Sequence, residues 1–277
     1  RNGVAVSVFL IAAVGFWSIF MIVLPQLFMV EMAFRPKLPP TRMGGPDDIY
    51  TLENFRYLIF DHSSAMQSVV NTGVYSGTAA TLAVLLAVAA AYVTTRKLSR
   101  LALFITFMCI IPFVIPGIIL AIAIYASFAP PPVALYGTMT ILVLAYLIRF
   151  LPIAFVSTSA AIGGVHPEME EAVRSLGGSR LLAIRKIVRP LINKSIIAAW
   201  LLVFIGATRE LSSAMFLYVP QTRPMSITLL DLSMENQLEL LAAVGFMMLV
   251  APFVVVFIGT RLLGRDFSIA PEPGEGA

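Results

Sequence analysis

The sequence is poor in the side chains that form disulfides, metal sites and most catalytic centres. Its 277 residues include one cysteine and two histidines. Cys109 has no second cysteine with which to form an intrachain disulfide, and because it lies in a long apolar run we expect it to pack as a small hydrophobic side chain. The sequence has no cluster of cysteine and histidine, so we expect no metal site and no cofactor.

Charged residues are also scarce. They make up 12% of the chain, whereas hydrophobic residues make up 59% and the mean hydropathy is +0.91. Soluble domains contain about 25% charged residues. This chain therefore has too few polar side chains to cover the surface of a water-soluble globule. We infer an integral protein of the lipid bilayer that does not bind nucleic acid.

Long apolar runs recur along the chain. About 20 apolar residues suffice for a helix to cross the roughly 30 Å of bilayer hydrocarbon. Six runs reach that length, at approximately 4–30, 66–95, 101–126, 137–160, 195–219 and 239–262. Because backbone polar groups in lipid have to pair within their own segment, each run is predicted to be a helix. The fold class is therefore all-α, a polytopic membrane protein with six transmembrane helices.

The two ends of the chain differ in character. The first apolar run is too long for a signal peptide and lacks a small-residue cleavage site, so we expect it to be retained. A chain that begins with Arg1 rather than methionine indicates trimming, or excision from a longer polypeptide. We assign residues 1–265 to one transmembrane domain and residues 266–277 to a short, disordered cytoplasmic tail.

Basic residues are distributed unevenly between the two sides of this topology. With six spans both termini share a side, and lysine and arginine favour the cytoplasm. Twelve basic residues fall on the side of the termini: Arg1, Arg96, Lys97, Arg100, Arg174, Arg180, Arg185, Lys186, Arg189, Lys194, Arg261 and Arg265. Five fall on the opposite side: Arg35, Lys37, Arg42, Arg56 and Arg223. We therefore expect cytoplasmic termini, and His62 and His166 on opposite sides of the membrane.

Two longer connections are expected on the external side. Residues 31–62 contain a Pro- and Gly-rich stretch followed by TLENFRYLI, which has the pattern of a short amphipathic helix. Residues 220–238 begin with a proline-bounded turn and predict a further short helix.

The cytoplasmic segment at about 161–194 is predicted to form a helix-turn-helix. Pro167 suits the first position of a helix, and acidic residues follow it in the first turn, where they complement the helix dipole. Gly177 and Gly178 supply a left-handed stop, and Ser179 can cap the next helix. The first helix has an apolar face formed by Met169, Ala172, Val173 and Leu176. A helix of about ten residues is unstable alone in water, so this face has to dock on something.

Two interpretations of this segment compete. A basic cytoplasmic loop often lies against anionic lipid. The order of residues, however, resembles the EAA signature of ATP-binding-cassette importer permeases, E-A-A-x3-G-x9-I-x-L-P. The matching residues are Glu171, Ala172, Gly177, Ile187 and Pro190. Val173 and Arg189 depart from the pattern, where it has alanine and leucine.

The resemblance implies a coupling element in a protein of the bacterial cytoplasmic (inner) membrane. In such permeases the short helix inserts into a groove on a cytoplasmic ATPase. By position, Glu171 would be the anchoring acid, Ala172 and Val173 the closely packed face, and Gly177 the turn. The implied partners are two ATPase subunits, a second permease half that is identical or homologous, and an extracytoplasmic solute-binding protein. The external connections would receive that binding protein.

Enzymes and scaffolds are the rival classes. The chain has no GxxxxGK[ST] run, so ATP hydrolysis is assigned to a partner subunit, and no HExxH or intramembrane nucleophile with a base, so an intramembrane enzyme is disfavoured. A membrane scaffold would have no use for a docking helix with this spacing. We predict a permease that is not itself an enzyme.

Three charged residues fall inside predicted spans. Arg149 and Arg209 lie about 11 and about 14 residues from the cytoplasmic ends of their spans, which at 1.5 Å per residue is near mid-bilayer. Such residues face protein or water and commonly have a partner. One interpretation is an ion pair between Arg149 and Glu210, which we predict. The other is that an arginine lines the translocation path.

Further segments resemble one branch of these permeases. PPPVALYGTMTILVLAYLIRFLP and TRELSSAMFLYVPQTRPMSITLLDL resemble the ferric-iron transport permeases, which are related to the spermidine/putrescine, thiamine and aminoethylphosphonate permeases. The resemblance covers about residues 50–260 and implies ferric iron as substrate, with the relatives' ligands as alternatives. Two arginines against one glutamate within the spans suit an anion, such as chelated ferric ion or a phosphonate, better than a polyamine.

Prolines interrupt the third span. Pro112 and Pro116, with Gly117, remove or strain backbone hydrogen bonds. We expect a packing kink there, and the alternative is that the freed carbonyls line the cavity.

Overall fold

The computed structural model describes residues 2–36, 50–98 and 100–262, and within these ranges the chain forms helices and no β-strand. This confirms the all-α fold. Five helical stretches are long and apolar enough to span a membrane: Val6–Ala33, Ser64–Thr95, Met139–Gly163, Arg180–Thr208 and Leu238–Gly259. A bent pair of helices makes a sixth if it is counted as one span. The predicted tail at 266–277 lies outside the described residues.

The chain divides into two compact units. The first comprises Arg1–Gln67 and Thr228–Val250, and the second comprises Ser68–Ile227 and Ala251–Ala277. The limits between the units fall within three helices, namely α4 (Ser63–Thr95), α12 (Met225–Met234) and α13 (Leu238–Leu262).

The first unit begins with one long helical stretch, formed by α1 (Asn2–Ser18), a π-helical turn at Ile19–Val23 and α2 (Leu24–Ala33). Asn54, at the start of α3 (Glu53–Arg56), is buried and its Nδ2 donates to the carbonyls of Ala33 and Arg35 at 2.9 and 2.7 Å. It thereby satisfies carbonyls at the end of α2. The helical structure continues through Tyr57–Asp61, so the short helix predicted in TLENFRYLI is confirmed.

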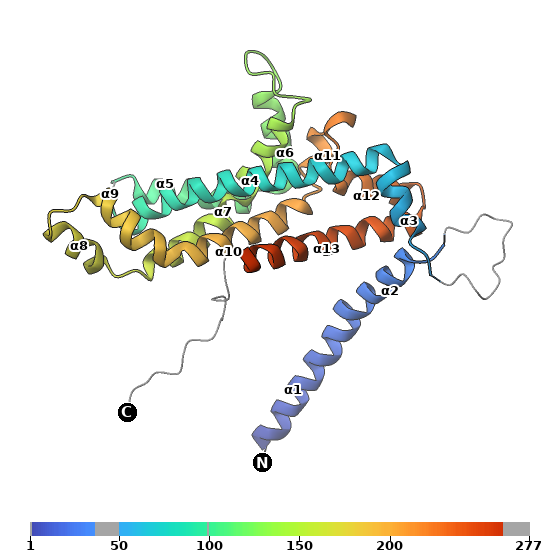
Figure 1. Cartoon of the computed structure of the whole chain (residues 1–277), viewed down its shortest axis with the longest axis horizontal. Coiled ribbons are helices and arrows are strands. Elements are labelled where there is room, and N and C mark those ends of the chain that lie inside the picture. Colours follow the sequence, from blue (N-terminus) through green and yellow to red (C-terminus); the bar gives the residue numbers. More distant parts are fainter. Residues whose placement is uncertain (1, 37–49, 99, 263–277) are drawn as a thin grey trace. The chain divides into compact units, whose positions relative to one another are not determined.

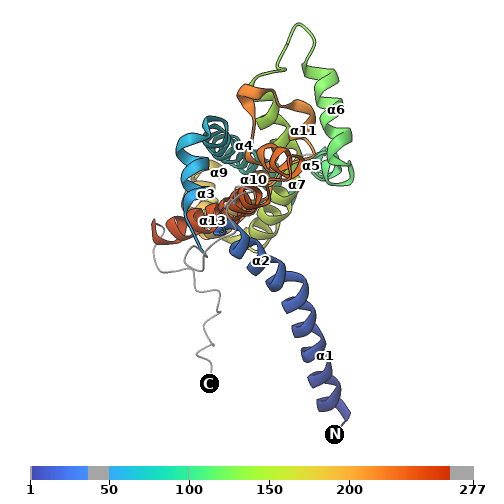
Figure 2. The same ribbon diagram turned by 90° about the vertical axis from the view of Figure 1, so that its right-hand side faces the viewer.

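The second unit is a bundle in which α4, α7 (Met139–Gly163) and α10 (Arg189–Thr208) run side by side (Figure 1 and Figure 2). Along α4 the side that packs into the core is built from alanines. Ala80, Ala83, Ala87 and Ala91 are each fully buried. Small side chains let helix backbones approach closely. In lipid the hydrophobic effect does not drive helices together, so this close packing is what holds them in contact.

The third predicted span is not one helix. Residues 102–128 form α5 (Ala102–Val114) and α6 (Gly117–Phe128), which meet at an angle of 114° (Figure 1). Proline disfavours the helical conformation in the residue before it, and Ile115 is accordingly extended, with φ −78° and ψ 125°. The expected kink is therefore a complete break, because Pro116 both follows an extended residue and lacks an amide hydrogen.

The fifth predicted span, 195–219, is also interrupted. The helix ends at Thr208, and a four-residue helix, α11 (Ala214–Leu217), follows after a break. Arg209 and Glu210 therefore lie in the break rather than on the helix on which we had expected them. The short helix predicted within 220–238 is confirmed as α12.

Candidate functional site

The predicted helix-turn-helix is present at one end of the bundle. It consists of α8 (Pro167–Ser175), a tight turn, and α9 (Arg180–Ala183), which runs through a π-helical turn at Ile184–Val188 into α10 (Figure 1). The Oγ atom of Ser179 accepts a hydrogen bond from the amide of Leu182 at 3.2 Å, which confirms the predicted N-cap. We call residues 166–183 the knob.

Two adjacent glycines make the turn of the knob for different reasons. Gly177 has φ +83°, the left-handed conformation that favours glycine. Its amide donates to the carbonyl of Arg174 at 3.0 Å, and the amide of Gly178 donates to that of Val173 at 2.9 Å. This pattern is a Schellman motif and confirms the predicted stop. A Cβ atom on Gly178 would lie 2.6 Å from Cγ1 of Val173, so Gly178 is required by space.

Glu170 fixes the knob to the end of α4. Its Oε1 accepts a hydrogen bond from Nε of Arg96 at 2.7 Å and forms an ion pair with Nη2 of Arg96, also at 2.7 Å. Its Oε2 accepts a hydrogen bond from the hydroxyl of Tyr92 at 2.6 Å. Nη2 of Arg96 also donates to the carbonyl of Val165 at 2.8 Å. The Glu170 side chain is thus buried with all its charge compensated. This cluster holds the first turn of α8 against the bundle.

Sequence reasoning missed Glu170 and Arg96. Three acidic residues begin α8, and any of them can interact with the helix dipole. Which one turns inward depends on how the helix is rotated against α4, and the only available signal was the Tyr92 and Arg96 pair four residues apart near the end of a span.

The exposed surface of the knob carries apolar side chains beside one acid. Glu171 and Ala172 are exposed, and so are Met169, Leu176 and Leu181, with relative exposures of 42, 90 and 74%. Glu171 also lines an open pocket together with Tyr92 and Arg96. Among the described residues the carboxylate of Glu171 has no hydrogen bond or ion pair. Val173 is half-buried against Gly178, so its contact is within the knob.

A second candidate region lies where the two helix breaks meet, and we call residues 112–117 and 208–213 the broken-helix junction. Nη1 of Arg149, on α7, donates to the carbonyl of Ile115 at 2.7 Å and lies 3.5 Å from that of Pro112. The guanidinium therefore satisfies carbonyls that the break leaves without a helical partner.

Glu210 approaches the same junction from the other break. Its Oε1 accepts a hydrogen bond from the amide of Ser213 at 2.9 Å and lies 3.5 Å from the position of a Cβ atom on Gly117. Gly117 is needed here, because such a Cβ would be 2.8 Å from that of Ser212. The main-chain carbonyl of Glu210 accepts a hydrogen bond from Ser226 Oγ at 2.9 Å.

The predicted ion pair between Arg149 and Glu210 is not formed. No ion pair at 4.0 Å or less joins Arg149 or Glu210 to another described residue. Both charges bind main-chain groups instead, because the two breaks supply free carbonyls and amides nearby. Arg209 differs from both: its side chain is exposed, and the described part of the chain gives it no partner.

Side chains of α4 hold the segment that follows α11. Nδ2 of Asn71 donates to the carbonyls of Gln221 and Arg223 at 3.2 and 3.0 Å, and the amide of Met225 donates to Oγ1 of Thr72 at 2.7 Å. Residues 221–225 are thus anchored on a transmembrane helix through their main chain, although the sequence predicted a loop there.

Residues 79–268 match the binding-protein-dependent transport system inner membrane components, and the match covers more than half of the chain. The chain belongs to this family. Its members are inner-membrane transport permeases and not enzymes, which confirms the resemblance drawn from the EAA signature and places this chain among multi-pass membrane proteins.

Ferric and spermidine/putrescine permeases are among the proteins to which the chain is similar. The ferric transport system permease protein FbpB of Actinobacillus pleuropneumoniae is 27% identical over 258 residues, which are 92% of this chain and 36% of that protein. The chain thus spans about a third of the length of this relative. The spermidine/putrescine permease PotC of Escherichia coli is 26% identical over 212 residues, 76% of this chain and 78% of PotC.

Solved structures share the fold. A bacterial alginate ABC transporter, crystallised with an alginate pentasaccharide-bound periplasmic protein, has a chain that superposes with a TM-score of 0.75 at 14% identity. The superposition covers 95% of this chain and 94% of that one.

Proposed function

We propose that this chain is one permease half of an ATP-driven importer, which lines the translocation path and is coupled through the knob to separate cytoplasmic ATPase subunits. The observation that carries the proposal is the difference between two adjacent acids. Glu170 anchors the knob to α4, whereas Glu171 is exposed beside apolar side chains. A partner with a basic, apolar-lined groove is complementary to such a surface.

The knob is suited to transmit movement in both directions. A charge-assisted contact at Glu171 would resist separation of the ATPase from the permease, and the apolar side chains around it would resist compression. ATP binding would bring two ATPase subunits together, and the attached knobs would rock two permease halves between inward-open and outward-open states. The second half is another copy of this chain or a homologous one. The external connections would receive a solute-binding protein.

Ferric iron is the proposed substrate. Two observations support it. Ferric permeases align with 92 and 80% of this chain, at 27 and 28% identity. The broken-helix junction carries an exposed Arg209 whose side chain has no partner among the described residues. A cation in this position suits ferric ion accompanied by an anionic chelator. Spermidine, putrescine, thiamine and phosphonates are the alternative substrates, of which the phosphonate shares the negative charge.

Reconstitution tests the proposal. The chain is co-expressed with its ATPase and second half, inserted in vesicles, and supplied with the solute-binding protein loaded with ferric citrate, a polyamine, thiamine or a phosphonate. We expect the ferric form to raise ATP turnover and to drive ⁵⁵Fe into the vesicle lumen. If only another ligand stimulated ATP turnover, that ligand would be the substrate and the assignment as an importer would stand. No ATPase association and no stimulation by any loaded binding protein would overturn the importer itself.

A further inference from the structure

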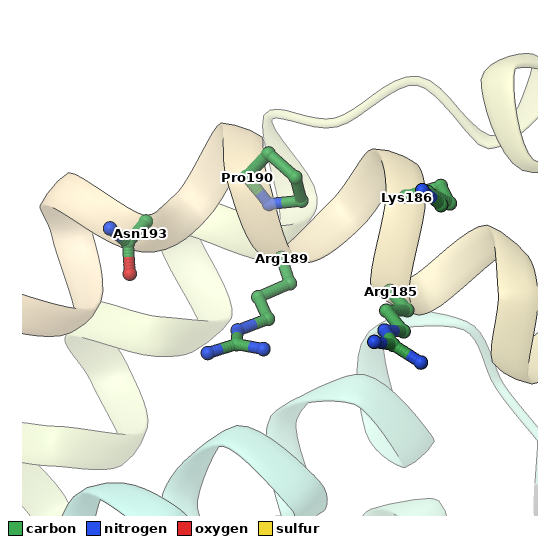
Figure 3. Close-up of a pocket in the computed structure, with 5 residues that line it drawn as sticks. All are labelled: Arg185, Lys186, Arg189, Pro190 and Asn193. Atoms are coloured by element: carbon green, nitrogen blue, oxygen red, sulfur yellow. The ribbon is translucent and has the colours of Figure 1, made fainter.

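A cluster of basic residues lines a pocket where α9 passes into α10. Arg185, Lys186, Arg189, Pro190 and Asn193 surround an open pocket of about 420 Å³, and Arg185, Arg189 and Asn193 extend toward the same side of the helix (Figure 3). The side chains of Arg185, Lys186 and Arg189 are exposed. In the part of the chain that the structure describes, none of these three has a hydrogen-bond or ion-pair partner, and no acidic residue lines the pocket.

The pocket lies just outside the level where the helix is expected to enter the membrane. The apolar run of this helix begins at residue 195, and Lys194 is the last charged side chain before it. At 1.5 Å per residue, Arg189 lies about 9 Å outside that boundary, within reach of the headgroup layer, and Arg185 is about one turn further out.

The same face of α10 continues as an apolar strip into the membrane. Ile196 and Trp200 follow Arg189 by seven and eleven residues, a spacing that keeps them on one helix face. Both are partly buried against the core of the second unit. Trp200 stacks on Phe204 with ring centroids 5.1 Å apart, and its Nε1 donates to Thr81 Oγ1 at 3.0 Å. The ring is thus held in a fixed orientation.

We propose that this face binds an anionic glycerophospholipid, with its phosphate between Arg185 and Arg189, its polar headgroup near Asn193, and an acyl chain along Ile196 and Trp200. Guanidinium groups bind phosphate oxygens through paired hydrogen bonds, and basic pockets at the end of transmembrane helices attract anionic headgroups. The apolar strip favours a lipid over free phosphate, which has no chain to place there. It also favours a lipid over the ATPase, which does not reach into the membrane.

Trp200 provides a direct readout, because the chain has only two tryptophans, Trp17 and Trp200. In a Trp17→Phe variant of the full chain, Trp200 is the sole fluorophore. The protein is reconstituted in phosphatidylcholine vesicles that contain a small fraction of either brominated phosphatidylglycerol or brominated phosphatidylcholine, since bromine on an acyl chain quenches tryptophan on contact. We expect an apparent preference of about fivefold or more for phosphatidylglycerol at Trp200, given that each basic residue near a membrane surface favours anionic lipid.

Matched variants assign the preference to the pocket. Arg185→Gln with Arg189→Gln should reduce the preference to about one, and Arg185→Lys with Arg189→Lys should retain part of it. Arg100→Gln removes an exposed basic residue that is outside the pocket and should leave the preference intact. A Trp200→Phe variant, which reports from Trp17, should show no preference that depends on Arg185 and Arg189. Tryptophan emission and thermal unfolding of each variant verify that it is folded.

Several results would overturn the proposal. Equal quenching by the two lipids in the parent protein would show that the face has no preference for anionic lipid. A preference that persists in the double glutamine variant would show that Arg185 and Arg189 do not form the site. Loss of the preference in millimolar inorganic phosphate at constant ionic strength would assign the pocket to free phosphate. An unchanged lipid preference together with lost co-purification of the ATPase in the double glutamine variant would assign these arginines to a protein contact.

Discussion

Glu170 and Glu171 are adjacent in the sequence and have opposite environments. Glu170 is buried and bonded to Arg96 and Tyr92, whereas Glu171 is exposed on the knob without a partner in the described part of the chain. Substitutions at the two positions should therefore have different effects. Loss of Glu170 should affect how the knob folds, and loss of Glu171 should affect what the knob binds.

Reversing the charge of Glu171 should uncouple the importer. We expect Glu171→Lys to abolish the stimulation of ATP hydrolysis by loaded binding protein, because the proposed anchoring acid would become a cation and would repel a basic groove on the ATPase. Membrane insertion and thermal stability should not change. Glu168→Lys is the matched control, since Glu168 is an exposed acid in the first turn of the same helix. Unchanged coupled transport in Glu171→Lys would show that Glu171 does not take part in the coupling contact.

Removing the carboxylate of Glu170 should loosen the knob. Breaking a buried ion pair costs about 3–5 kcal/mol when the remaining charge cannot reach water. Here both side chains keep about 10% of their exposure, and Arg96 retains Val165 as a partner, so we expect the lower end or less. Trypsin should cleave Glu170→Ala faster after Arg174 and Arg180 than the parent protein. Equal cleavage rates would show that the cluster does not hold the knob.

The two glycines of the knob should respond differently to a second substitution. Gly177→Ala should destabilise the knob by about 1 kcal/mol, because alanine disfavours a positive φ. Gly178→Ala should also destabilise it, because the new Cβ meets Cγ1 of Val173. Adding Val173→Ala should restore part of the stability lost in Gly178→Ala, because it removes Cγ1. The recovery is only partial, because the new Cβ would still lie 2.8 Å from the carbonyl oxygen of residue 173. The same addition should not restore the stability of Gly177→Ala. Protease resistance of the knob is the measurement.

The broken-helix junction should tolerate no side chain at Gly117. Its Cβ would lie 2.8 Å from the Cβ of Ser212, so we expect Gly117→Ala to lower the thermal unfolding temperature in detergent by several degrees. Gly77→Ala is the matched control, because a Cβ there meets nothing within 4 Å. Adding Ser212→Gly should restore stability. If Gly117→Ala and Gly77→Ala unfold at the same temperature, the two breaks are not in close contact.

Arg209 should determine substrate preference without contributing to stability. Its side chain is exposed and makes no ion pair with a described residue. We expect Arg209→Gln to reduce uptake of an anionic substrate by about tenfold or more, because a cation facing the path would be lost, and to leave the unfolding temperature within about a degree. Arg209→Lys should keep most of the uptake. Lower stability with normal uptake would identify Arg209 as a structural residue.

The sequence predicted features that depend on local chemistry. Gly177, Gly178 and Ser179 have conformational requirements of their own, so the stop and the cap of the knob were predicted at the correct residues. Pro116 predicted a kink for the same reason. Its size was not predictable, because an angle of 114° depends on what packs against the two helices after the backbone has separated.

Features that depend on contacts distant in sequence were predicted poorly. No proline or glycine follows Thr208 within the break, and Gly206 lies inside the last turn of α10, so Arg209 and Glu210 were assigned to a continuous helix. That assignment led to the expected pair with Arg149. The actual partner of Arg149 is the carbonyl of Ile115, between α5 and α6, which becomes available only because the third span breaks. A kink that was sharper than expected and a break that was not predicted thus changed the partners of both charges.

The knob and the broken-helix junction lie at opposite ends of the same rod. Residues Arg180–Thr208 are 29 residues of uninterrupted helical structure, which at 1.5 Å per residue extend about 43 Å, with the π-helical turn at Ile184–Val188 as the one irregularity along it. Tilting the knob by a few degrees would therefore displace the far end by ångströms without any hinge to absorb the movement. The helix would thus act as a lever, and the largest displacement would occur at Arg209 and Glu210, directly after its end.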